Sequence, residues 1–260
     1  MSSRVDSSAG HHGRRRVEPA GGDPVGLVRR VVRRYGGRYS TALGIDVDAG
    51  ETEVERWFLA ATLFGNRIAT TIAMRTYRVL HDAGVTAVGR AGAVSWQRLV
   101  SLLDEGGYTR YDFQTATRLQ TLAAVLAEQY GGRVAELSRQ APTYPGLRAA
   151  LDTLPGWGPV TIELFLRELR GVWPGAAPPM ATRATRAAAH LHLLDGGTAG
   201  DDLARLARVA RLAGLDARDV EAALVRLALA HRDMATCAGG PGCTALTDDR
   251  TNGARAGPPW

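Results

Sequence analysis

The fold of this chain is decided by a glycine-rich turn between two helical patterns, 154-LPGWGPVT-161. Before the turn, residues 145–153 begin with proline and repeat leucine at helical spacing, which is typical of a surface helix. After it, Pro159 suits the first position of a second helix, because its missing N–H would have no partner there. Gly171 is placed to end that helix. The sequence therefore predicts a helix-turn-helix hairpin.

The turn is suited to bind an anion through its backbone. Two glycines in four residues let the chain adopt positive φ and approach a partner closely. The N–H groups of Gly158, Val160 and Thr161 lie at the positive end of the second predicted helix. Such an array binds phosphate without reading a base sequence. The alternative is an ordinary corner between two helices, closed by a glycine cap.

The extended pattern Leu-Pro-Gly-aromatic-Gly-Pro-x-Thr between two helices resembles the hairpin of the helix-hairpin-helix (HhH-GPD) DNA glycosylase superfamily, the group of endonuclease III and AlkA. The order of parts agrees with this family from about Val54 to Gly171, after a TEVE capping box at Thr52. The resemblance implies an all-α fold of two helical lobes, with the hairpin at the cleft and double-stranded DNA as partner. The residues implied to grip its phosphate are Gly156, Trp157, Gly158, Val160 and Thr161.

The family also carries a polar residue between its early helices, which fills the gap left by a flipped base. Asn66 stands at that position, and the resemblance implies that Asn66 and Arg67 face the interior of the DNA helix. The alternative is that Asn66 caps a break in the helix at Gly65.

The catalytic groups of this family are missing. The hairpin lysine of bifunctional members is replaced by Val160, and all 32 basic residues of the chain are arginine, so no side-chain amine can form a Schiff base. Residues 171–194 contain neither Asp nor Glu. The position of the family's catalytic aspartate therefore falls on Ala177, Pro178 or Ala181.

Two glutamates of the second hairpin helix are weak catalytic candidates. Glu163 and Glu168 could act as a general base or an electrostatic stabiliser. Their spacing with Arg167 and Arg170 favours ordinary surface ion pairs instead.

The chain has two cysteines, in the arrangement Cys237-x5-Cys243. The iron-sulfur loop of the endonuclease III branch needs four, so we expect no cofactor and no bound metal. The pair could still bind a metal with His231 and Asp233, or form a redox-sensitive bridge. Free thiols in a tight glycine-proline turn are the more ordinary interpretation.

Composition and patterning set the domain organisation. Of the 260 residues 45% are hydrophobic, and the net charge of +6 suits a polyanionic partner. We expect a disordered basic tail over 1–24, a two-lobed helical domain over 25–246 and a flexible tail over 247–260. The middle lobe is predicted at 53–171, and the second lobe at 25–52 plus 172–246.

The same patterning predicts the cellular setting. No apolar stretch is long enough to cross a bilayer and no secretory segment follows the start, which predicts a cytoplasmic protein, nucleoid-associated if bacterial, with no membrane partner. We also expect a monomer.

The leading hypothesis is a DNA-binding protein of the base excision repair type that recognises damaged or flipped bases. Either it is a monofunctional DNA glycosylase with a displaced catalytic acid, or it is a non-catalytic protein that still binds DNA. The absent lysine and aspartate favour the second version. The alternative of a different class is a non-catalytic helical regulatory or partner-binding protein, in which the hairpin is only architecture.

Overall fold

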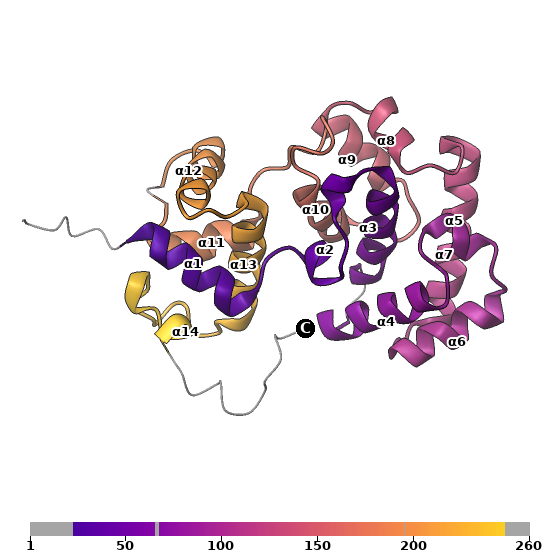
Figure 1. Cartoon of the computed structure of the whole chain (residues 1–260), viewed down its shortest axis with the longest axis horizontal. Coiled ribbons are helices and arrows are strands. Elements are labelled where there is room, and N and C mark those ends of the chain that lie inside the picture. Colours follow the sequence, from indigo (N-terminus) through magenta and orange to yellow (C-terminus); the bar gives the residue numbers. More distant parts are fainter. Residues whose placement is uncertain (1–22, 66–67, 195, 248–260) are drawn as a thin grey trace, which may run out of the picture.

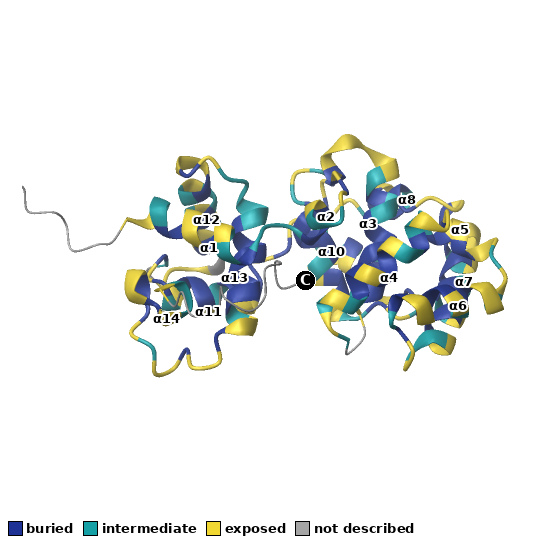
Figure 2. Cartoon of the chain, turned by 60° about the horizontal axis from the view of Figure 1, so that its bottom comes forward, coloured by how far each residue is buried: buried dark blue, intermediate teal, exposed yellow. Residues whose placement is uncertain are grey.

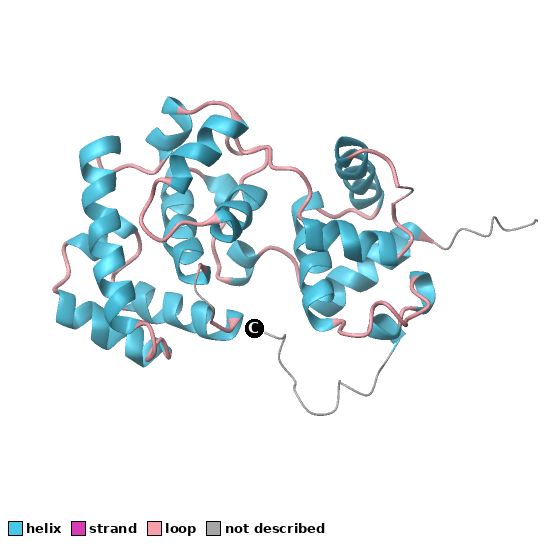
Figure 3. Cartoon of the chain, turned by 180° about the vertical axis from the view of Figure 1, so that it is seen from behind, coloured by secondary structure: helices cyan, strands magenta, loops and turns pink. Residues whose placement is uncertain are grey.

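The structure is a computed structural model that describes residues 23–65, 68–194 and 196–247. Within these ranges the regular structure is helical and contains no strand, which confirms the predicted all-α class (Figure 3). Among the described helices, none combines the length and the apolar character that crossing a membrane requires.

The helices form two lobes, which lie side by side in Figure 1. The larger lobe contains α2 (Tyr39–Ala42), η1 (Val47–Ala49), α3 (Glu51–Phe64), α4 (Thr70–Asp82), α5 (Val88–Gly92), α6 (Trp96–Gly106), α7 (Asp112–Tyr130), α8 (Ala135–Gln140), α9 (Tyr144–Asp152) and α10 (Pro159–Glu168). The smaller lobe contains α1 (Pro24–Tyr35), α11 (Thr182–His190), α12 (Ala199–Leu212), α13 (Ala217–Ala230), η2 (Gly240–Gly242) and α14 (Thr244–Thr247).

Each lobe has its own hydrophobic core, visible as a buried interior in Figure 2. Tyr39, Ile45 and Val47 belong to the core of the larger lobe, and so do Trp173 and Ala176. The sequence placed both of these segments in the second lobe. The structure moves the boundaries to about residues 38 and 177, because the apolar side chains of η1 and its neighbours pack against the larger core rather than against α1.

Local end signals predict several helix ends well. The Ser95 hydroxyl accepts a hydrogen bond from Arg98 N at 3.3 Å, which caps α6. Gly131 ends α7 in the left-handed conformation, with φ 57°. The predicted capping box at Thr52 is wrong, because α3 begins after Gly50 and the carboxylate of Glu55 accepts the backbone N–H of Val134 at 2.7 Å instead.

Candidate nucleic-acid interface

The predicted helix-turn-helix is formed by α9, a turn over residues 153–158, and α10. Pro159 occupies the first turn of α10, as its missing N–H favours. Gly156 has φ 81°, and Trp157 N donates to the Leu154 carbonyl at 3.0 Å. The turn therefore reverses the chain through a single left-handed glycine.

Backbone donors are open at the start of α10. Gly158 is the N-cap residue and its position supplies no side-chain capping bond. In the part of the chain that the structure describes, the first backbone bond of this helix runs from Ile162 N to Gly158 O, at 3.0 Å. Val160, in the first turn, is 66% exposed. The positive end of α10 therefore presents uncapped amides at a solvent-facing site, where an anion is stabilised.

The side chain of Trp157 points into the protein. It is 4% exposed, and its ring stacks on Phe58 with centroids 4.3 Å apart. Its Nε1 donates to Thr62 Oγ1 at 3.2 Å, and its ring meets Phe165 edge-on at 5.1 Å. Thr161 is also buried, at 2% exposure. These two predicted phosphate contacts anchor the turn to α3 and α10, which leaves the backbone near Gly156, Gly158 and Val160 to face solvent.

The two hairpin glycines have different reasons to be glycine. At Gly156 a Cβ would lie 2.1 Å from Arg118 Cδ, and the φ of 81° is unfavourable for other residues. At Gly158 a Cβ would meet nothing within 4 Å, and φ is −115°. Only Gly156 is therefore required by the fold, whereas the missing side chain of Gly158 keeps the surface above the amides open.

An open hollow of about 470 Å³ lies beside the turn. It is lined by Phe113, Gln114, Thr117, Arg118 and Thr121 of α7, and by Pro155 and Gly156. The exposed ring of Phe113 lies 5.4 Å from the ring of Trp96. An arginine and an exposed aromatic side chain are suited to phosphate contact and base stacking. Sequence reasoning missed Phe113 and Arg118, because they come about 40 residues before the hairpin and match no local motif.

The predicted wedge residues, Asn66 and Arg67, lie outside the described residues. Gly65, which precedes them, packs against the hairpin. A Cβ at Gly65 would lie 2.6 Å from Thr161 Oγ1 and 3.3 Å from the Gly156 carbonyl oxygen. The chain therefore leaves α3 directly beside the turn.

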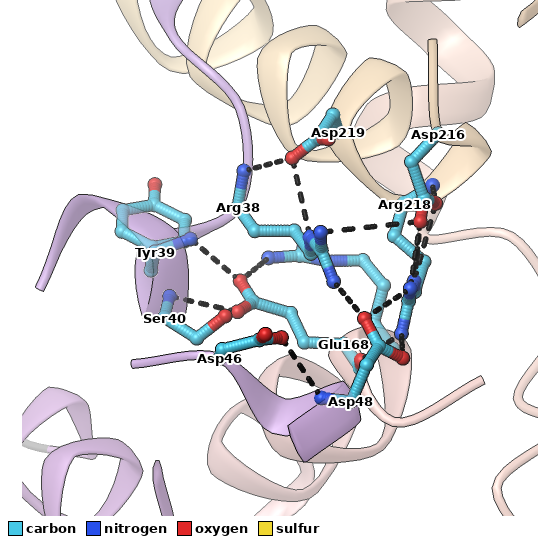
Figure 4. Close-up of polar contacts among 10 residues, drawn as sticks. Arg38, Tyr39, Ser40, Asp46, Asp48, Glu168, Asp216, Arg218 and Asp219 are labelled. Carbon is cyan, nitrogen blue, oxygen red and sulfur yellow. Dashed lines mark hydrogen bonds and ion pairs between the residues drawn. The ribbon is translucent and has the colours of Figure 1, made fainter. Parts of the chain in front are cut away.

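Glu168, one of the two candidate acids, has a structural role. It is fully buried, and its Oε1 and Oε2 accept the backbone N–H groups of Tyr39 and Ser40, each at 2.8 Å (Figure 4). Arg167 Nη2 lies 3.7 Å from Oε1 and is buried with it. The predicted surface ion pair is wrong for Glu168, because α2 covers the last turn of α10. Glu163 is exposed on the same helix.

The lobes are joined by charged residues that we call the interlobe clasp: Arg38, Asp48, Asp216, Arg218 and Asp219 (Figure 4). Arg218 contacts Asp48 at 2.8 Å and Asp216 at 2.6 Å. Arg38 contacts Asp48 at 3.1 Å and Asp219 at 3.3 Å. Hydrogen bonds from Arg218 lower the pKa of the Asp48 carboxyl. Because Asp48 lies within η1 of the larger lobe and Asp216 and Asp219 lie at the start of α13, these bonds hold one lobe against the other.

A second contact between the lobes lies where the family's catalytic aspartate was expected. Arg170 forms an ion pair with Glu221 of α13 and donates to the Pro178 carbonyl at 2.9 Å. Glu221 is fully buried, and its Oε1 accepts Ala181 N at 2.8 Å. The structure thus brings a carboxylate to Ala181 from 40 residues further along the chain. Its partners are Arg170 and the start of α11, so it holds the lobes together.

Comparison with known proteins adds no family assignment. No protein-family model matches the chain, and no curated protein is similar to it in sequence. The function of this chain is therefore inferred from its hairpin, its charge and its side-chain clusters.

Proposed function

We propose that this protein binds double-stranded DNA through the hairpin of α9 and α10, with the exposed amides at the start of α10 contacting a backbone phosphate. The observation that carries this proposal is the uncapped, solvent-facing N-terminus of α10 behind a turn that buries Trp157. The net charge of +6 favours a polyanionic partner. Phosphate contacts position a protein on DNA without selecting a sequence.

The hairpin pattern and the helices that precede it support a role of the base excision repair type, in which the protein recognises damaged or flipped bases. The residues favour recognition without covalent chemistry. Val160 stands where a lysine would attack the sugar, and the carboxylates of Glu168 and Glu221 are buried and bonded to backbone amides. Glu163 remains the exposed acid of α10 through which a monofunctional glycosylase could act.

The DNA-binding proposal is tested by placing a negative charge on the open amides. In Val160→Glu the fold is kept, because a carboxylate is favourable in the first turn of a helix. We expect its affinity for a duplex with an abasic-site analogue to fall about tenfold or more at low salt, through repulsion of the phosphate. The measurement is fluorescence anisotropy across a salt series. Leu212→Glu is the matched control, because it changes the net charge by the same amount. Leu212 is 67% exposed on α12 of the smaller lobe, away from the hairpin, so this variant should bind DNA as wild type does.

A second variant blocks the same surface without a charge. In Gly158→Leu the backbone conformation suits any residue and the added Cβ meets no neighbour within 4 Å, so the variant should fold and yet weaken binding. If wild type binds with a steep salt dependence and both hairpin variants bind equally well, DNA contacts another surface. If wild type binds no duplex even at low salt, the regulatory or partner-binding alternative holds.

The chemical role is tested by single-turnover reactions on duplexes that carry uracil, oxidised pyrimidines, alkylated purines or mismatched adenine. We expect no strand break with or without hot alkali, because the nucleophilic amine is absent and the carboxylates of Glu168 and Glu221 are bonded within the fold. Breaks that need alkali would identify a monofunctional glycosylase instead. Glu163→Gln would then show whether the exposed acid of α10 is responsible.

A further inference from the structure

Four side chains with metal-binding atoms converge at one end of the smaller lobe. His190 is the last residue of α11, and His231 follows the end of α13. Cys237 and Cys243 flank η2. One nitrogen or sulfur atom from each residue lies within 4.8 Å of the corresponding atom of every other. This cluster, which we call the His2Cys2 cluster, is separate from the hairpin.

One ring nitrogen of each histidine in the cluster lacks the hydrogen-bond partner that a buried polar atom normally has. Within the described part of the chain, the Nε2 atoms of His190 and His231 are both buried and neither has a hydrogen-bond partner. His231 is 8% exposed, and the two rings lie 5.1 Å apart. A buried imidazole nitrogen without a partner is costly and calls for a physical explanation. A metal ion bound between the two rings would give both nitrogens a partner.

The thiols are arranged as metal ligands are. Both cysteines are free, and Cys243 is fully buried. Thr244 N donates to Cys237 Sγ at 3.4 Å, the type of bond that orients and stabilises a ligating thiolate. The loop between the cysteines packs tightly on the end of α11, because a Cβ at Gly239 would lie 2.2 Å from the His190 carbonyl oxygen. The close approach of that loop brings both sulfurs to the histidines.

We propose that the His2Cys2 cluster binds one zinc ion. Two thiolates and two imidazoles are a ligand set that tetrahedral zinc prefers. With bonds of about 2.0 Å to nitrogen and about 2.3 Å to sulfur, the ligand atoms of such a site lie roughly 3 to 4 Å apart, so a closure of about 1 Å completes this one. Four protein ligands leave no open position, which makes the zinc structural: it fastens the ends of α11 and α13 to the loop before α14.

The zinc proposal departs from the expectation that the chain binds no metal. A four-iron cluster does not fit, because only two of the four donors are cysteines. The predicted ligand set also changes: His231 is a member, Asp233 is not, and His190 takes its place. The zinc proposal is independent of DNA binding, since none of its residues belongs to the hairpin.

The test is metal content and cobalt spectroscopy on the full chain, purified under reducing conditions. We expect about one zinc per chain, removable by a chelator. Cobalt added to the metal-free protein should give the visible bands of a tetrahedral ion and a thiolate-to-cobalt charge-transfer band, saturating at one equivalent. Removing the zinc should also lower the thermal midpoint by several degrees.

Two variants separate the proposal from its alternatives. Cys237→Ser replaces a partly exposed ligand and should weaken cobalt binding at least tenfold, with loss of charge-transfer intensity. His81→Ala removes a histidine of the larger lobe and should bind cobalt as wild type. The proposal is overturned if the reduced protein takes up no zinc or cobalt, or if Cys237→Ser binds cobalt unchanged. It is also overturned if the native chain has a mass two hydrogens lower, which would mean a disulfide.

Discussion

Replacing Trp157 with alanine is expected to lower the free energy of unfolding by about 4 kcal/mol. The side chain is 4% exposed, stacks on Phe58 and meets Phe165 edge-on. Alanine leaves a cavity between the turn and α3, and it removes the bond from Nε1 to Thr62. The measurement is chemical denaturation followed by circular dichroism.

Trp96→Ala is the control for this prediction. Trp96 is partly exposed on α6, and its Nε1 donates to Thr117 Oγ1 at 3.0 Å near the surface. The Trp96→Ala substitution should lower the free energy of unfolding by about 1 kcal/mol, because it removes less buried apolar surface than Trp157→Ala does. A Trp157→Ala variant no less stable than Trp96→Ala would show that the turn is not anchored by its tryptophan.

Removing the carboxylate of Glu168 is expected to lower the free energy of unfolding by about 3 kcal/mol. In Glu168→Ala the buried N–H groups of Tyr39 and Ser40 lose their acceptors, and the buried Arg167 loses its nearby negative charge. The loss should appear in a denaturation curve. Glu168→Gln should cost less, because its amide oxygen still accepts one of the two bonds.

Glu163→Ala is the matched control, since Glu163 is exposed on the same helix. Its effect should stay within about 0.5 kcal/mol, as for most surface substitutions. If Glu163→Ala and Glu168→Ala are equally stable, the buried carboxylate does not hold α2 against α10. The comparison also separates architecture from catalysis, because Glu168→Ala should lose stability whether or not the protein has an activity.

These residues explain how the hairpin could bind a phosphate without rearranging. Trp157 and Thr161 hold the turn from inside, while Gly156 accepts the close approach of Arg118. A site whose donors are already fixed loses little conformational entropy on binding. If the hairpin binds DNA as proposed, variants of these interior anchors should therefore also lower the affinity for DNA.

The sequence by itself determined the helical class and the hairpin, because both follow from short-range rules. Pro159 cannot donate the N–H that a helix interior requires, so it marks the start of α10. Ser95 and Gly131 mark helix ends for similarly local reasons. Local sequence signals predict a helix end less well where a distant group competes for the same side chain. At Thr52 the expected capping box does not form, because the Glu55 carboxylate accepts the backbone N–H of Val134.

Tertiary structure alone decided which side chains meet. A residue between two glycines has no periodicity to show which way it points, so the burial of Trp157 could not be read from the turn. Packing between elements far apart in the chain places the carboxylates of Glu168 and Glu221 against the backbone N–H groups that they bind. His190 stands 41 residues before His231, and no spacing rule links them. Only the packing of α11 against α13 brings the two imidazoles to the cysteines, because contacts of long sequence separation depend on the whole fold.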